Sequence, residues 1–243
     1  MLYKQFQSHP MLANYIDAYW IVSGEQGVRT EKIMPDGCVD LIFNAGEACI
    51  TDNGNFTMHH GRFYLVGTMT SVKKVNMSGE TKLFGIRFKP AAFQFFFKFS
   101  SLHEIKNATI EFEKKISPQI PKGAQNVFAY LDRFLVNRLS KPRYNLLPVV
   151  ADVQDQMGHI DIKNLAQDHC MTLRQIERLF KQQIGITPKE FSKFVRYQHA
   201  HSVIQKNISN RSLEDIAFEC GYYDHSHLTN EFKRYTGAPP SMI

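Results

Sequence analysis

The side chains best suited to specific chemistry gather near residue 175. Arg174 and Arg178 are four residues apart, so on a helix they stand one turn apart on the same face, with Gln175 and Glu177 beside them. Arginine can hydrogen-bond guanine through two donors, and glutamine can bond adenine in the same two-pronged way. The spacing is therefore typical of a helix that reads base edges in a major groove. A solvated amphipathic helix has the same pattern, and a single copy would favour that simpler interpretation.

The pattern occurs twice, and the repetition changes the interpretation. Phe180–Pro188 recurs 52 residues later as Phe232–Pro240, with Phe, Lys, Gly and the final Pro in register. An apolar residue followed by Ala precedes each copy, at Leu165-Ala166 and at Ile216-Ala217. Two copies of one helix-turn-helix unit explain this arrangement best.

Capping residues define the first unit. Asp161 can cap a helix that starts at Ile162, and Thr172 with Gln175 forms a capping box for the next helix after a break at Cys170-Met171. The inward stripe expected for this second helix is Leu173, Ile176, Leu179 and Phe180.

The second unit follows the same logic. Ser212 and Asp215 form a capping box, Gly221 supplies a left-handed residue that ends the helix, and Asp224 caps the next one. The outward positions of that next helix are His225, Ser226, Thr229, Asn230, Lys233 and Arg234. They carry less positive charge than the first unit offers, so we expect looser base readout from this half.

A stiff helix joins the two units. Thr187 at the cap, Pro188 at the first position and Glu190 three residues after the cap predict its start, and it should run to about Gln205. Roughly 18 residues at 1.5 Å each give a length of about 27 Å. A turn of DNA is about 34 Å, so two helices held by this rod would enter successive grooves only if the duplex bends.

Residues 145–243 resemble the DNA-binding domain of the AraC/XylS family of bacterial transcription regulators, including the closing Gly237-Ala238-Pro239-Pro240-Ser241. The resemblance implies a sequence-specific regulator that binds double-stranded DNA, with RNA polymerase as a candidate partner. The base-contacting positions expected on this basis are Arg174, Gln175, Glu177, Arg178, His225, Ser226, Thr229 and Asn230. Candidate phosphate contacts are Lys181, Lys189, Lys233 and Arg234, with an exposed, solvated side chain as the alternative.

Charge qualifies this expectation. The chain has a formal net charge of +6 and a pI near 9.1, a balance that favours polyanionic partners. Residues 1–150 hold 18 basic and 12 acidic side chains, whereas residues 151–243 hold 11 of each. We therefore expect modest intrinsic DNA affinity and a strong dependence on dimerisation or on an effector.

The first hundred residues predict short strands, bounded by turn sequences such as Pro35-Asp36-Gly37 and Asn53-Gly54. The expected strands are 15–22, 31–34, 39–43, 48–51, 56–59, 63–66, 72–77 and 83–88, with an apolar helix, Ala91–Phe99, opened by Pro90. Such spacing indicates a barrel or sandwich. Met34–Phe43, Val66-Gly67-Thr68 and Phe84–Pro90 are similar to the cupin-like sensor half of one AraC subgroup, which implies a barrel with room for a small-molecule effector. The H-x-H pattern of metal-binding cupins is missing, so we expect no metal and no cofactor.

The expected fold class is α+β, with a β-rich sensor or assembly domain in residues 1–118, a helical linker in 119–144 and the DNA-binding domain in 145–243. A helix is predicted over about Ala124–Leu139, and its apolar face serves either packing on the barrel or a homodimer of paired helices. The residues of that face proposed for dimerisation are Val127, Phe128, Leu131 and Leu135.

Composition and cysteine usage limit the classes of protein to which this chain could belong. The sequence opens on no export signal and contains no run of 18 apolar residues, so a cytoplasmic protein without a membrane partner is expected. The four cysteines show no C-x-x-C spacing and are expected to be small buried hydrophobes. Two rival functions remain open, a non-specific architectural DNA binder and an enzyme or alkyl acceptor working through Cys38, which would need a depressed thiol pKa. We expect no catalytic residues.

Overall fold

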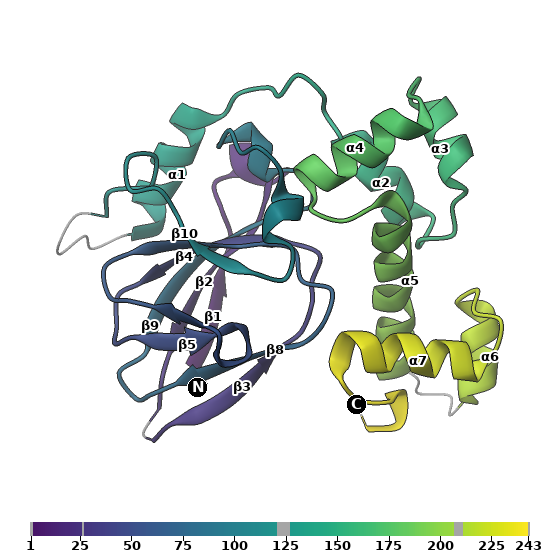
Figure 1. The fold of residues 1–243 in the computed structure, drawn as a ribbon, viewed down its shortest axis with the longest axis horizontal. Helices are drawn as coiled ribbons and strands as arrows, with labels where there is room; N and C mark the ends of the chain where they lie inside the picture. Colours follow the sequence, from purple (N-terminus) through teal and green to yellow (C-terminus); the bar gives the residue numbers. More distant parts are fainter. Residues whose placement is uncertain (1, 26, 121–126, 207–210, 243) are drawn as a thin grey trace.

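The computed structural model describes residues 2–25, 27–120, 127–206 and 211–242, which form a β-rich part followed by a helical part (Figure 1). The strands lie between Leu2 and Glu111, and the α-helices lie between Val127 and Thr236. The α+β fold class predicted from the sequence is confirmed. None of the described helices combines the length and the apolar character that crossing a bilayer requires.

The β-rich part consists of two antiparallel sheets. The larger has the order β1-β2-β9-β4-β7-β10 and the smaller the order β3-β8-β5-β6. The strands are β1 (Leu2–Phe6), β2 (Ile16–Ser23), β3 (Arg29–Ile33), β4 (Val39–Asn44), β5 (Cys49–Thr51), β6 (Phe56–Met58), β7 (Phe63–Val66), β8 (Lys73–Met77), β9 (Lys82–Phe88) and β10 (Thr109–Glu111).

Successive side chains of a strand point to opposite faces, and the central strands of the larger sheet carry buried residues on both. One face packs against the smaller sheet through residues such as Trp20, Ile42 and Leu83. The other face forms a second core that includes Leu41 and Ile86. The first core is the interior of the barrel.

Eight predicted strands occur within two residues of their expected bounds, whereas β1 and β10 were not predicted. β1 is an edge strand with all five residues exposed, so it lacks the alternation that identifies a half-buried strand. The predicted helix Ala91–Phe99 is wrong: only a 3-10 turn, Phe93–Phe95, occurs there. Ala91 has a φ of 66°, which no right-handed helix tolerates, and the surrounding phenylalanines fill the second core instead.

The helix α1 (Val127–Arg138) lies along that second core, and residues 124–126 of its predicted span fall outside the described residues. Leu131 and Leu135 are buried there, Val127 packs against the core, and the ring of Phe128 stacks on Tyr19 at 5.3 Å. The four side chains expected to mediate dimerisation are thus occupied within the chain. A homodimer of paired helices stays a prediction, and its contacts would have to use a face of α1 other than the one that packs on this core.

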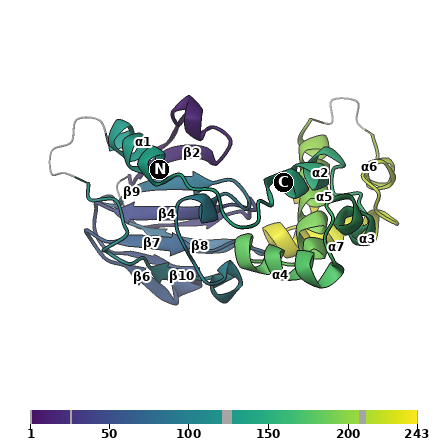
Figure 2. The ribbon, with the colours of Figure 1, turned by 90° about the horizontal axis from the view of Figure 1, so that it is seen from above.

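The described residues of the helical part form six α-helices. They are α2 (Leu147–Asp155), α3 (Ile162–Asp168), α4 (Leu173–Gln183), α5 (Pro188–Gln205), α6 (Leu213–Glu219) and α7 (His225–Thr236). In Figure 1, α4 and α7 cross opposite ends of α5, and both run from the outer edge of the helical part toward the barrel. Seen from above, the helical part stands beside the end of the sheets, while α1 covers a different side of them (Figure 2).

Candidate nucleic-acid interface

The first helix-turn-helix unit consists of α3 and α4. Asp161 accepts hydrogen bonds from the amides of Lys163 and Asn164 at the start of α3, and the hydroxyl of Thr172 accepts from the amide of Gln175 at 3.1 Å. Between the helices Cys170 takes a φ of 52°, which produces the predicted break. Cys170 is exposed and Cys38 is half-buried, so the expectation of four buried cysteines is confirmed only at Cys49 and Cys220.

α4 presents its two arginines to solvent. Ile176, Leu179 and Phe180 are buried and the side chains of Arg174 and Arg178 are exposed. Leu173 is 49% exposed, contrary to the expected inward stripe, because it is the first residue of α4 and the buried face begins at Ile176.

The four base-contacting candidates of α4 differ in access, because Gln175 and Glu177 are half-buried beside the two exposed arginines. Arg178 lies 5.9 Å from the ring of Tyr144, which also contacts Arg143 at 5.4 Å. Tyr144 was not among the predicted site residues, and its only signal in the sequence was its position next to the basic segment Lys141–Arg143.

The second unit, α6 and α7, repeats this geometry. Asp224 accepts from the amide of His227 at 2.7 Å, and Gly221 has the left-handed φ of 66° expected at the end of α6. Leu228 and Phe232 pack inward. The outward candidates are exposed at His225, Ser226, Asn230, Lys233 and Arg234 and half-buried at Thr229.

α5 begins and ends where the sequence predicted, over 18 residues. Its capping box is complete: Thr187 Oγ1 accepts from the amide of Glu190 at 3.1 Å, and Glu190 Oε2 accepts from the amide of Thr187 at 2.9 Å. Burial would raise the pKa of Glu190, but Lys106 and Thr187 outweigh it and lower this pKa to about 2. Lys189, a phosphate candidate, is exposed one residue before Glu190.

Contacts along α5 hold the two units in one arrangement. Ser192 Oγ donates to the carbonyl of Gly158 at 2.7 Å, beside the turn that precedes α3. Further along α5, Arg196 lies 4.8 Å from the ring of Tyr222 and 3.8 Å from the buried carboxylate of Glu231 on α7. Because both units share these contacts with one rigid helix, α4 and α7 are positioned together.

The barrel lies against the chain just after the C-terminal ends of both outward helices. Thr68 Oγ1 donates to the carbonyl of Ile184, and His103 Nδ1 lies 2.8 Å from the carbonyl of Gly185, just after α4. Lys106 forms a 2.7 Å ion pair with Glu190 at the start of α5. A Cβ at Gly237, after α7, would lie 3.4 Å from Val72. The N-terminal ends of α4 and α7 therefore face away from the barrel (Figure 1).

Among the candidate phosphate contacts, Lys181 lies nearest to the contact between the barrel and the end of α4. Its side chain is half-buried and its carbonyl accepts from the hydroxyl of Ser101 at 3.3 Å. It lies toward the barrel end of α4, so it is less accessible than Lys233 or Arg234.

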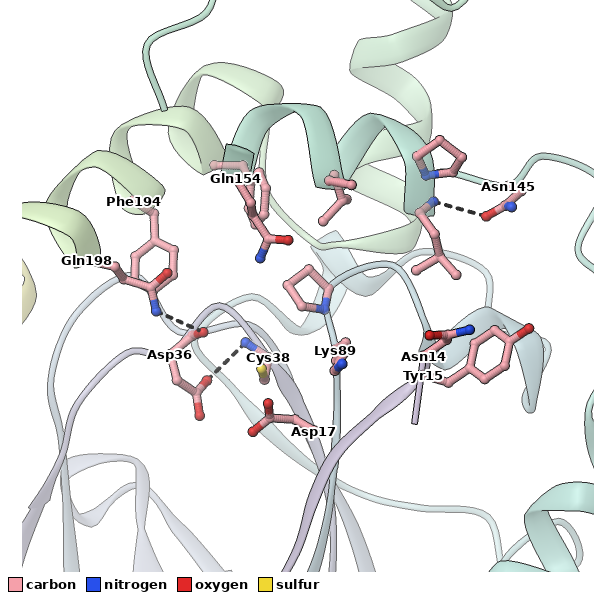
Figure 3. Close-up of a pocket in the computed structure, with 16 residues that line it drawn as sticks. Asn14, Tyr15, Asp17, Asp36, Cys38, Lys89, Asn145, Gln154, Phe194 and Gln198 are labelled. Carbon is pink, nitrogen blue, oxygen red and sulfur yellow. Dashed lines mark hydrogen bonds between the residues drawn. The ribbon is translucent and has the colours of Figure 1, made fainter. Parts of the chain in front are cut away.

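A cavity of about 710 Å³ lies between the barrel and the helices α2 and α5 (Figure 3). Asp36 lines it from the turn before β4, where a carboxylate oxygen accepts from the amide of Cys38, and its backbone carbonyl accepts from Nε2 of Gln198 on α5 at 3.4 Å. The next residue, Gly37, is so close to α5 that a Cβ would lie 2.6 Å from the ring of Phe194. The turn Pro35-Asp36-Gly37 thus joins the barrel to the helix that connects the two units.

Cys38 lines the same cavity. Burial raises the pKa of its thiol well above the ordinary value, and Asp36 and Asp40 add to this effect. A nucleophilic role would require a thiol pKa below the ordinary value, whereas the pKa of Cys38 is shifted in the opposite direction.

No group of three His, Cys, Asp or Glu side chains arranged to hold a metal ion occurs in the part of the chain that the structure describes. The structure therefore adds no candidate metal site to the surface described above.

Comparisons with known proteins agree with this two-part organisation. Residues 4–111 match a family described as a domain of unknown function (DUF6597), and residues 165–243 match one described as a helix-turn-helix domain. The HTH-type transcriptional activator RhaS of Escherichia coli is 25% identical over 155 residues, covering 59% of this chain and 54% of that protein. RhaS of Klebsiella pneumoniae is 35% identical over 72 residues, covering 30% of this chain and 25% of that protein. The chain thus spans about half the length of the E. coli relative.

A solved structure of ToxT from Vibrio cholerae has a similar overall fold. The match covers 100% of this chain and 97% of that one, with a TM-score of 0.51 and 9% sequence identity. At this identity the likeness concerns the fold alone.

Proposed function

Because this chain belongs to the AraC/XylS family of transcription regulators, we propose that it binds double-stranded DNA at specific sequences and thereby regulates transcription. One observation carries the proposal: two helix-turn-helix units, each with an outward second helix, are fixed to the same 18-residue α5. Parallel helices at the two ends of a rod can enter two major grooves on one side of a duplex.

Direct readout depends on the exposed side chains near the N-terminal ends of these helices. Arg174 and Arg178 supply it from α4, and Asn230 with His225 and Ser226 supplies it from α7. Gln175, Glu177 and Thr229 are half-buried and contribute less. Lys189, Lys233 and Arg234 contact phosphates, and Lys181 does so more weakly because the barrel lies close to it.

The barrel is the regulatory part of the proposal. A cavity of about 370 Å³ inside it is within the range of small-molecule sites. We place the sensor domain in residues 1–118, the linker in 119–144 and the DNA-binding domain in 145–243. The equal numbers of acidic and basic residues in 151–243 support a homodimer, because two copies double the available phosphate contacts. RNA polymerase is the further partner and the cytoplasm the compartment in this proposal.

Competition between DNA selected from a random pool and unselected DNA tests this function. We expect the full chain to prefer selected DNA by about a thousandfold or more, whereas a ratio near one would instead indicate a non-specific architectural binder. The exposed arginines of α4 provide the matched variant. Arg178→Ala should lose about 1 to 3 kcal/mol of discrimination at one base pair.

The control is Arg133→Ala, an exposed arginine on α1, which should leave the selected sequence unchanged. An unaltered sequence preference in Arg178→Ala would reject the readout role of Arg178.

A further inference from the structure

The barrel cavity has apolar walls and one charged end. Methionine and aliphatic side chains of both sheets line most of it, among them Val22, Met58, Val75 and Met77. At one end stand Asp40, Arg87 and Trp20, from β4, β9 and β2. The backbone register brings these three together, because β9 pairs Asp40 with Arg87 on one side and Gly85 with Trp20 on the other.

Asp40 is only partly satisfied by its neighbours. It is 8% exposed, and its Oδ1 accepts a 2.7 Å hydrogen bond from Nε1 of Trp20. The nearest cationic atom is Nε of Arg87, 3.4 Å from the same oxygen. Among the described residues no hydrogen bond reaches Oδ2 of Asp40, so one carboxylate oxygen remains available to a donor in the cavity.

Arg87 is shared with a second carboxylate. Its Nε is closer to Oδ2 of Asp36, at 2.9 Å, than to Asp40. Lys73, the other buried cation that lines the cavity, is paired with Asp52 at 2.6 Å. Lys32 lines the cavity as well, but its side chain is exposed. Two carboxylates therefore share one guanidinium at the charged end, and burial raises the pKa of Asp40 to about 6.

Aromatic rings complete this end. Trp20 and Tyr3 line the cavity with ring centroids 6.3 Å apart. Aromatic faces attract cations, and a carboxylate forms its strongest hydrogen bonds with charged donors. The geometry points to an apolar organic cation, a protonated amine with a hydrocarbon body, as the ligand of the barrel cavity, with the ammonium group donating to Asp40. This inference rests on the proposed function only in assigning the cavity to an effector.

Three probes with one hydrocarbon body and different head groups test the charge preference. They are 4-phenylbutylamine, 4-phenylbutanol and 4-phenylbutyrate, titrated into the full chain while the fluorescence of its one tryptophan, Trp20, is recorded. We expect the affinity for the amine to exceed that for the alcohol by about tenfold or more, because a hydrogen bond between charged groups contributes a binding free energy of that size. The carboxylate should bind most weakly. Equal affinities, a preference for the carboxylate, or no saturable change with any probe would overturn the inference.

The substitution Asp40→Asn keeps the size of the side chain and removes its charge. It should reduce amine affinity about tenfold and leave alcohol affinity unchanged. Asp17→Asn, at an exposed residue that lines the other cavity, is the matched control and should bind all three probes as the wild type does. Amine binding that is unaffected in folded Asp40→Asn would contradict the role of Asp40. If this variant does not fold, the ranking of the three probes on the wild-type chain decides alone.

DNA selectivity measured on the same samples separates this inference from the proposed function. Amine binding without DNA selectivity would reject the proposed function and keep the ligand class. DNA selectivity with a carboxylate or neutral preference in the cavity would do the reverse.

Discussion

Gly85 makes room for the one tryptophan of the chain. A Cβ at this position would lie 1.8 Å from Cε2 of Trp20, so the indole ring lies directly against the backbone of β9. This close approach lets Nε1 of Trp20 reach Asp40 at 2.7 Å. The charged end of the barrel cavity therefore depends on a glycine in the middle of a central strand.

Gly85→Ala should destabilise the fold by about 1 to 3 kcal/mol, because the ring must move away from a well-packed position. Denaturant unfolding followed by circular dichroism measures this change. Lys82→Ala, at the exposed start of the same strand, should change stability by no more than about 0.5 kcal/mol. Equal stability of Gly85→Ala and the wild type would show that the ring does not rest on β9.

Glu190 caps α5 and forms an ion pair with Lys106 of the barrel, and its pKa lies below the ordinary value. A carboxylate whose pKa is lower in the folded state stabilises that state above its unfolded pKa and loses this effect as pH falls. For Glu190 the window runs from the ordinary value of 4.5 down to about 2.

Glu190→Gln should therefore be less stable than the wild type at pH 6, and the difference should shrink at pH 3.5. Denaturant unfolding at the two pH values checks this. Glu113→Gln, at an exposed position, serves as control. A difference between Glu190→Gln and wild type that is the same at both pH values would mean that the carboxylate charge is not what stabilises this contact.

At the scale of elements, α5 is the part that the sequence predicted most completely. Its start at Thr187-Pro188 and its end at Gln205 both agree with the structure, because local capping chemistry determines them. The prediction of a helix at Ala91–Phe99 failed because long-range packing, rather than local chemistry, determines the structure there. The phenylalanines of that segment pack against strands distant in sequence, and a periodic pattern does not record such contacts.

The length of α5 has a consequence for the bound DNA. Its 18 residues span about 27 Å, shorter than a DNA turn of about 34 Å. The units are also fixed to α5 by Ser192 and Arg196, so we expect the duplex, rather than the protein, to adjust.

A phasing gel-shift assay on a selected site should thus reveal a bend, with a deformation cost on the order of 1 to 6 kcal/mol. An unbent duplex bound by both units would contradict a rigid α5.

For the whole molecule, the two helix-turn-helix units could be predicted because the sequence repeats itself and each copy carries its own caps. The contacts of the barrel with the end of α4 and the start of α5 could not. Thr68 with Ile184 and Lys106 with Glu190 join residues far apart in the chain, and neither pair belongs to a motif. The Asp40 and Arg87 pair had a weak signal, since each is a charged residue within an apolar strand pattern, but its meaning depends on the register between β4 and β9.

We propose that α4 and α7 read two adjacent major grooves at once. The most direct measurement is a scan of single base-pair substitutions across a selected site, made with the wild type, Arg178→Ala and Asn230→Ala. We expect two clusters of sensitive base pairs about one helical turn apart, one losing its sensitivity in Arg178→Ala and the other in Asn230→Ala. A single cluster affected by both variants, or by neither, would contradict it.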